Sequence, residues 1–504
     1  MVDTVLPIAN GFYTSDSLPV SAQNCVNWYP HINEAPALNA EILFGTPGVS
    51  GGILFGDEPC RGMAVFGDRI YPDKVYFVNG NNLYSWDGVS PTVTYIVPTS
   101  VGGVTGTGLV SIAVGQTQMM IVVPGGEGFI VEKGYGGAPD TLDLIMDSGF
   151  VANGVPEAVV YVDGYFVCPM RENSKFIISA LNDGLSWNAL DFGSAESSPD
   201  AAVSAVVVRN QLYIIGAAGV EQYANVPNGA GFPFQRSGLF LAQGALTPFS
   251  VIQFSDTFMM IGGSKNESPA VWMLDGNSMT KVSTSAIDSL LQDLVDVGIN
   301  DINAWSYAQA GHYFVGFGLP ETTIVYDLTT SRWHERSSRI YEGGVYTNVP
   351  YRVQGFALLR QILVASDNID GRIGVASLDS YTEYDMEIVR TFTTQPFQNN
   401  MQPFFVPKLE LTVESGVGLL DDDQPENAVN PSVRLEISRD GGKTWGETRT
   451  RLIGAMGEYN TRAVWRRNGR CKRFDLYRFS MSDPVKPVCI QLTAQIEAAD
   501  DAAA

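Results

Sequence analysis

The stretch Glu436–Glu447, EISRDGGKTWGE, contains residue types that could either bind a phosphate group or close a tight turn. A phosphate-binding loop needs a glycine five residues before Gly442 and a helix after Lys443. Ile437 occupies the first of these positions, and residues 448–453 lack the apolar spacing of a helix and predict a strand. The pattern therefore argues against nucleotide binding.

The same stretch fits a second pattern, Ser-x-Asp-x-Gly-x-Thr-Trp, better. It resembles the Asp-box, a β-hairpin whose Asp and Ser side chains cap the turn while the Trp packs beneath it. Sialidase-like glycosidases often carry several copies, so the motif makes a glycosidase a rival hypothesis. The matching residues are Ser438, Asp440, Gly442, Thr444 and Trp445.

Residues suited to catalysis or metal binding show no further pattern. Glycoside hydrolysis needs two facing carboxylates, and no sequence argument selects a pair among 54 acidic residues. His31, His312 and His334 are far apart in sequence with no ligand spacing, and the acidic stretch 419–427 lacks the alternation of a calcium loop. No G-x-S-x-G elbow occurs. We therefore expect no enzyme activity, cofactor or metal.

The composition favours a large, strand-rich, acidic protein. The 504 residues are 45% hydrophobic, with 52 Gly, 25 Phe and 21 Tyr, and the formal net charge is −23. Such acidity disfavours general nucleic-acid binding, because phosphates are repelled. The opening residues lack a secretory signal and no run of 18 apolar residues occurs, so we expect synthesis in a cytosol and no membrane span. The cysteines lack CxxC spacing and are expected to be buried free thiols: Cys25, Cys60, Cys168, Cys471 and Cys489.

An internal repeat dominates the middle of the chain. Seven short apolar strands, spaced 44 to 55 residues apart, mostly follow a polar or glycine-containing turn that another apolar strand precedes. Hairpins at this spacing predict the blades of a β-propeller. The strands begin at Val75, Met119, Tyr165, Leu212, Phe258, Tyr313 and Ile362.

We therefore predict an all-β protein: a β-propeller of about seven repeats, with six blades as an alternative, followed by an antiparallel β-sandwich. A long β-sandwich with regular loops is the alternative to the propeller. The predicted domains are an N-terminal extended arm over 1–55, the propeller over 56–380, the sandwich with a basic hairpin over 381–497, and an acidic, alanine-rich tail over 498–504.

One helix is predicted in the longest step of the repeat. Apolar residues at 287, 290, 291, 294 and 295 follow Ser283-Thr284-Ser285, which is the spacing of an amphipathic helix after an N-cap. We expect this helix to pack against the rim of a blade, with a neighbouring subunit as the alternative, and to end at Gly298.

A basic stretch is the strongest charged feature of the sequence. Residues 449–478 contain nine cations and two acids, out of 31 cations in the chain. Asn468-Gly469 predicts a type I′ hairpin at its centre, in which Arg467 opposes Arg470 and Trp465 opposes Lys472. Because cations would occupy both faces of that hairpin, we expect an anionic partner, either a neighbouring subunit or DNA phosphate. The expected partner-binding residues are Arg462, Trp465, Arg466, Arg467, Arg470, Lys472 and Arg473.

The residues 464–473, VWRRNGRCKR, carry a family resemblance. The stretch closely resembles the C-terminal region of the packaged-DNA stabilisation proteins of short-tailed bacteriophages, which are also described as head-completion, tail hub or nozzle proteins. NWYP at 27–30, GTPGV at 45–49 and IQLTAQIE near the C-terminus are similar to that family as well.

This resemblance implies a structural protein of the virion tail, synthesised in the host cytoplasm. It implies a homohexameric ring below the portal and its adaptor, or head–tail connector, ring, with distal tail proteins such as a needle, spike or fibre as further partners. The ring would close the channel after DNA packaging and let DNA pass, without specific recognition, at ejection. The alternative function is a propeller-based, glycan-binding or glycan-cleaving, sialidase-like tail protein.

Overall fold

The computed structural model describes residues 2–15, 17–54, 56, 58–66, 74–99, 102–134, 138–197, 200–226, 231–297, 301–420 and 425–499. The chain divides into two compact units. We call the first the propeller unit, Gly52–Tyr307 with Arg352–Val375, and the second the sandwich unit, Met1–Gly51, Ala308–Tyr351 and Ala376–Ala504. Strands β7 (Gly48–Leu54) and β29 (Asn303–Gln309) each contain a unit boundary.

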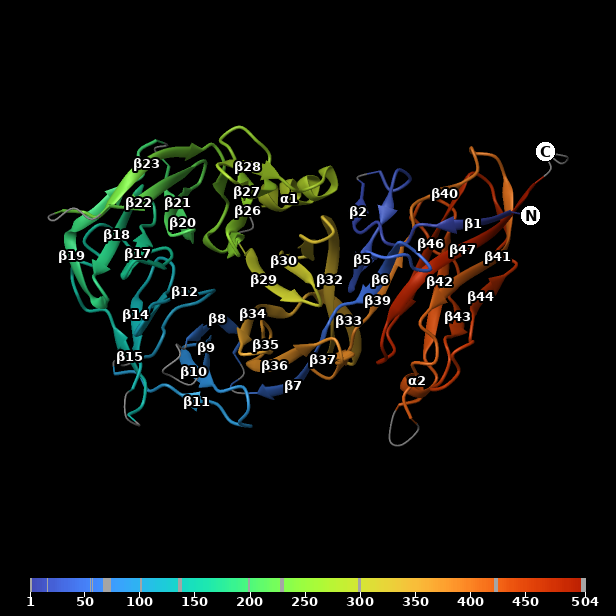
Figure 1. Ribbon diagram of the computed structural model, residues 1–504, viewed down its shortest axis with the longest axis horizontal. Coiled ribbons are helices and arrows are strands. Elements are labelled where there is room, and N and C mark those ends of the chain that lie inside the picture. Colours follow the sequence, from blue (N-terminus) through green and yellow to red (C-terminus); the bar gives the residue numbers. More distant parts are fainter. Residues whose placement is uncertain are drawn as a thin grey trace. The chain divides into compact units, whose positions relative to one another are not determined.

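The described part of the propeller unit contains six antiparallel sheets (Figure 1). The first holds β8 (Cys60–Phe66), β9 (Lys74–Asn79), β10 (Asn82–Trp86) and β11 (Thr94–Tyr95). The second holds β12 (Ser111–Val114), β13 (Gln118–Val122), β14 (Gly128–Glu132) and β15 (Thr141–Leu144). The third holds β16 (Val160–Val162), β17 (Tyr165–Pro169), β18 (Lys175–Ala180) and β19 (Asp183–Ser194).

The remaining three sheets continue the same order along the chain. The fourth holds β20 (Ala202–Val208), β21 (Gln211–Gly216), β22 (Val220–Asn225) and β23 (Phe234–Leu241). The fifth holds β24 (Gly244–Ala245), β25 (Val251–Phe254), β26 (Thr257–Gly263), β27 (Ala270–Asp275) and β28 (Ser278–Lys281), with a 3₁₀ turn at Pro248–Ser250. The sixth holds β34 (Val353–Leu359), β35 (Ile362–Asp367) and β36 (Arg372–Ser377).

Apolar side chains pack between neighbouring sheets of the propeller unit. Separate buried clusters join the first five sheets in consecutive pairs. A further cluster joins the sixth sheet, through Leu359, Val364 and Ile373, to Val75 and Phe77 of the first. Radial packing of this kind is that of a β-propeller, which confirms the predicted fold. Six of the seven predicted repeat strands lie in these sheets. The remaining one, which begins at Tyr313, belongs to the sandwich unit.

Helix α1 (Ser285–Val297) confirms the amphipathic helix of the fifth repeat. Ile287 and Leu291 are buried, and the helix contacts β27 of its own sheet. Lys281 and Asp288 form an ion pair at 2.5 Å next to its first turn. The predicted end at Gly298 lies outside the described residues, as do residues 421–424 of the acidic stretch and 500–504 of the tail.

The first sheet of the sandwich unit has the strand order β44-β41-β47-β6-β5. β1 also pairs with β47, and β45 pairs with β41. The strands are β1 (Val2–Leu6), β5 (Trp28–Ile32), β6 (Glu41–Gly45), β41 (Phe404–Val413), β44 (Ala463–Arg466), β45 (Arg470–Cys471) and β47 (Val488–Ala498). N-terminal strands, blue in Figure 1, therefore lie in the same sheet as red C-terminal ones.

The second sheet of this unit runs in the order β30-β31-β32-β4-β39-β46-β42-β43, with β33 on β32 and β40 on β46. Its strands are β4 (Cys25–Val26), β30 (His312–Gly318), β31 (Thr323–Asp327), β32 (Arg332–Glu342), β33 (Val345–Pro350), β39 (Arg390–Thr393), β40 (Phe397–Gln398), β42 (Ser432–Ser438), β43 (Arg449–Leu452) and β46 (Phe474–Met481). The other elements are β2 (Tyr13–Thr14), β3 (Ala22–Gln23), β37 (Thr382–Glu383), β38 (Met386–Glu387) and α2 (Glu426–Val429).

The core of the sandwich unit lies between these two sheets. Leu409, Trp465 and Leu492 of the first sheet are in one buried cluster with Leu435 and Phe479 of the second. This packing confirms the predicted C-terminal sandwich. The domain boundaries proposed from the sequence stay a prediction. All five cysteines are buried and free, as expected.

Candidate partner-binding surface

The basic stretch does not form the predicted hairpin. β44 and β45 do not pair with each other; both pair with β41, one after the other, at the edge of the first sandwich sheet. Arg466 is opposite Lys408, and Arg470 is opposite Phe405. The predicted pairing of Arg467 with Arg470 and of Trp465 with Lys472 was therefore wrong.

A bulge replaces the predicted turn at Asn468-Gly469. Residues 467–469 lie opposite only Val406 and Pro407 of β41, so the edge strand has one extra residue there. Pro407 has no N–H to donate to the ladder, yet its carbonyl oxygen accepts from Arg467 N at 2.9 Å. Arg467 and Gly469 have φ of 57° and 88°, so the extra residue is taken up by left-handed backbone.

Trp465 was expected at the partner surface, and the structure places it in the core instead. Its side chain is fully buried and meets the ring of Phe479 edge-on, with the centroids 5.5 Å apart. Cys471 is also buried. One face of this strand is therefore core, because alternate residues of an edge strand point to opposite faces of the sheet.

Arginine side chains from neighbouring segments cap the open edge of β44. Arg449 donates to the carbonyl oxygen of Arg466 at 2.7 Å, and Arg451 donates to that of Val464 at 2.8 Å. Arg439 donates to the carbonyl oxygen of Asn468 at 2.6 Å. The exposed edge of a sheet can pair with a further strand. Here the guanidinium groups already donate hydrogen bonds to the carbonyl oxygens that such a strand would use.

The remaining cations divide into paired and unpaired groups. Arg462 makes two hydrogen bonds of 2.6 Å to Glu410, which also binds Lys408. The Arg462 guanidinium lowers the pKa of the Glu410 carboxyl. Five exposed cations have no carboxylate partner in the part of the chain that the structure describes. We call them the basic edge: Arg466, Arg467, Arg470, Lys472 and Arg473.

The Asp-box forms the connection between β42 and β43. Asp440 Oδ1 accepts from Thr444 N at 2.9 Å, and its Oδ2 accepts from the Thr444 hydroxyl at 2.6 Å. Ser438 Oγ accepts from Gly442 N at 2.8 Å. The bonds from Thr444, with one that Ser438 Oγ donates to Asp440 Oδ1 at 2.8 Å, lower the pKa of Asp440 to about 2. Trp445 lies against the Arg478 guanidinium, 4.0 Å from ring centroid to Cζ. The motif acts as a turn closure in this structure.

The histidines, which are distant in sequence, lie close together in the sandwich unit. His31 Nδ1 is 2.8 Å from His312 Nε2, and His312 Nδ1 is 2.7 Å from Oδ2 of the buried Asp327. The Asp327 carboxylate accepts a hydrogen bond from His312 Nδ1, which places the proton of the neutral ring on that nitrogen. His312 Nε2 therefore accepts a hydrogen bond from His31 Nδ1. Burial, followed by the Arg336 charge, holds the pKa of His334 well below its usual range. His31, His312 and Asp327 therefore form a hydrogen-bonded chain between segments that are distant in sequence.

The described residues offer neither a metal-binding cluster nor a membrane-spanning helix. No group of three or more His, Cys, Asp or Glu side chains is placed to hold a metal ion within the described ranges. In the same residues, no helix has the length and hydropathy that a bilayer crossing requires.

Comparison with known proteins places this architecture in a family. Residues 4–381 match the family model described as bacteriophage P22 Gp10, β-propeller, and residues 389–497 match the model described as bacteriophage P22 Gp10, β-sandwich. The chain belongs to this family of tail hub proteins of short-tailed bacteriophages. It is 22% identical, over 411 residues, to the tail hub protein gp10 of Salmonella phage P22, covering 79% of this chain and 80% of the relative.

Solved structures resemble the chain only weakly. PorZ, a bacterial surface component of the type-IX secretion system of Porphyromonas gingivalis, matches with 9% identity and a TM-score of 0.38, over 71% of this chain and 44% of PorZ. The N-terminal domain of Nup159 matches with 8% identity and a TM-score of 0.41, over 69% of this chain and 98% of that domain. Similarity at this level supports no inference about function.

Proposed function

We propose that this structural tail protein forms a ring below the portal and adaptor rings. The ring closes the DNA channel after packaging and conducts DNA at ejection. The relative in phage P22 is a tail hub protein, and a hub must contact several neighbours at once. In this proposal the basic edge supplies one such contact. The observation that carries it is a group of five exposed cations that have no carboxylate partner among the described residues, on a chain of net charge −23.

A second copy of the chain suits the basic edge better than DNA does. The acidic excess of one subunit attracts the basic edge of the next, whereas it repels phosphate from the rest of the surface. Contact through added strands is disfavoured, because Arg449, Arg451 and Arg439 already occupy the edge carbonyls. The contact we propose is therefore made by side-chain ion pairs. It weakens at high salt because screening is strong beyond about 8 Å at physiological ionic strength.

A charge-reversal experiment tests this proposal. Arg466→Glu combined with Arg467→Glu removes two cations of the basic edge, and negative-stain microscopy and sedimentation then measure ring assembly with and without portal–adaptor particles. We expect the variant to fold but to lose rings or attachment. The matched control is Arg209→Glu with Arg360→Glu, which makes the same charge change at two exposed arginines of the propeller unit. Rings that persist in the first variant, or that fail equally in both, would contradict a role for the basic edge.

A further inference from the structure

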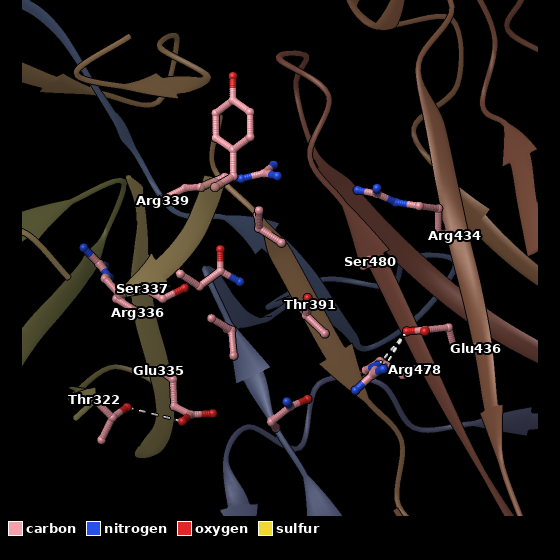
Figure 2. Close-up of a pocket in the computed structure, with 15 residues that line it drawn as sticks. Thr322, Glu335, Arg336, Ser337, Arg339, Thr391, Arg434, Glu436, Arg478 and Ser480 are labelled. Atoms are coloured by element: carbon pink, nitrogen blue, oxygen red, sulfur yellow. Dashed lines mark hydrogen bonds and ion pairs between the residues drawn. The ribbon is translucent and has the colours of Figure 1, made fainter. Parts of the chain in front are cut away.

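A polar cavity of about 560 Å³ lies in the sandwich unit (Figure 2). Five of its residues are successive cross-strand partners on β32, β4, β39, β46 and β42. In order, they are Glu335, Val26, Thr391, Ser480 and Arg434. Direct partners point to the same face of a sheet, so these side chains form one continuous floor. Four steps between strands give the floor a length of about 19 Å.

An arginine lies at one end of this floor and a glutamate at the other, and neither has an ion-pair partner among the described residues. At one end, Arg434 donates to Ser482 Oγ at 2.7 Å and has no carboxylate partner among the described residues. At the other end, Glu335 has one distant hydrogen-bond donor, Thr322 Oγ1 at 3.5 Å, and no cation among the described residues. Burial raises the pKa of the Glu335 carboxyl to about 7. The three residues between these ends are small, which leaves the floor open.

Two other arginines of the cavity are already paired with carboxylates. Arg478 pairs with Glu436 at 2.7 Å, and Arg339 pairs with Glu387 at 2.8 Å. Asn24 supplies a further free group, because its Oδ1 is buried and accepts no hydrogen bond within the described part of the chain. A buried acceptor without a donor is costly, so it favours a ligand that brings an N–H or O–H group.

We propose that this cavity binds an extended peptide segment of a partner protein. A carboxylate of the segment binds Arg434, and a lysine or another donor binds Glu335. Peptide N–H groups donate to Asn24 Oδ1 and to the hydroxyl oxygens of Thr391 and Ser480. At about 3.3 Å per residue, a floor of this length accommodates about six extended residues. This contact is separate from the basic edge and stands independently of ring formation.

The chemistry of the walls favours a peptide over a saccharide or a nucleic acid. Sugar rings pack on free aromatic faces, and Tyr346 is the one aromatic lining residue. Its ring is occupied by the Arg339 guanidinium at 4.6 Å and lies 4.7 Å from that of Tyr341. Four arginines and two glutamates line the cavity, but Arg339 and Arg478 are already paired with carboxylates. A phosphate backbone would also meet the Glu335 and Glu436 carboxyl groups, which disfavours a nucleic acid.

A net-neutral probe separates this site from the basic edge. The probe is a fluorescently labelled hexapeptide with lysine at one end, glutamate at the other and glycine and serine between them, and the readout is fluorescence anisotropy with the full chain. We expect Arg434→Gln to weaken binding about tenfold, as does replacing the probe's glutamate by glutamine. Combining both changes should add little, because they remove the same contact.

Matched variants distinguish filling of the cavity from misfolding. Thr391→Trp should abolish binding by filling the floor, whereas Thr391→Val, which removes only one hydroxyl acceptor, should weaken it by about threefold, and both should unfold at similar denaturant concentrations. The pair Arg466→Glu and Arg467→Glu should bind the probe normally even if it fails to form rings. The proposal is overturned if wild type does not bind the probe, if Arg434→Gln binds equally well, or if an acidic oligosaccharide displaces the peptide and binds more tightly.

Discussion

The indole N–H of Trp465 in β44 donates to the carbonyl oxygen of Arg449 in β43 at 2.7 Å. This bond joins the edge strands of the two sandwich sheets beneath the basic edge. We expect Trp465→Ala to destabilise the sandwich unit by about 3–5 kcal/mol, the usual range for a buried tryptophan. Trp465→Phe should cost less, since it keeps most of the packing but leaves the Arg449 carbonyl unpaired.

Denaturant unfolding followed by circular dichroism measures both Trp465 variants. Trp445→Phe is a suitable comparison, because Trp445 is only half-buried and stacks on one arginine. If Trp465→Ala were no more harmful than Trp445→Phe, the placement of Trp465 in the core would be wrong.

A buried ion pair in the propeller unit gives a second prediction. Arg352 Nε donates to Asp367 Oδ1 at 2.9 Å, and both side chains are buried. Arg352→Met should destabilise the unit by about 3–5 kcal/mol, because it leaves an uncompensated buried carboxylate. Adding Asp367→Leu should recover part of that loss, which thermal unfolding of the single and double variants measures. If the double variant is less stable than Arg352→Met alone, the destabilisation comes from loss of the ion pair and not from the buried carboxylate left without a partner.

The buried His334 predicts loss of stability in mild acid. Both ring nitrogens lack a hydrogen-bond partner in the described residues, and the pKa of His334 is held well below its usual range. The unfolded chain takes up a proton as the pH falls through about 6.5 and the folded chain does not, so the free energy of unfolding decreases. We expect His334→Phe to reduce this decrease between pH 7 and 5. Unfolding midpoints across that range test it, and parallel curves for both proteins would contradict it.

The Asp-box predicts a pH effect at lower values. The pKa of Asp440 is about 2, compared with about 3.9 in an unfolded chain, because Thr444 and Ser438 donate to its carboxylate. The stabilisation is complete above pH 4 and disappears as the pH falls through 2. The difference in unfolding midpoint between wild type and Asp440→Ala should therefore shrink over that interval. Asp256→Ala, at an exposed turn, should show no such change.

The sequence could predict features that depend on neighbours along the chain. The repeat strands around Tyr165 or Leu212 each form a hairpin with the preceding segment, so spacing and turn residues were sufficient. The prediction of a turn at Asn468-Gly469 was wrong because a strand distant in sequence, β41, pairs with both flanking segments. β41 offers a ladder to both flanking strands, and Pro407 accommodates the extra residue.

The contacts that sequence reasoning missed join distant segments. His31 and His312 are 281 residues apart, and spacing between them carries no information about their hydrogen bond. The cavity floor likewise draws single residues from five strands, between Val26 on β4 and Ser480 on β46. No local motif marks any of these residues as part of a site. They lie together only because of the order of the strands in the sheet.

The pairing of Val2 with Ile496 has a consequence for biosynthesis. Translation proceeds at about 5–20 residues per second, so β1 waits ~25–100 s for β47 to leave the ribosome. The propeller hairpins can form during that time from local segments, whereas the first sandwich sheet can close only once β47 has emerged. A chaperone that shields the emerging N-terminal strands would therefore be most useful before β47 is synthesised.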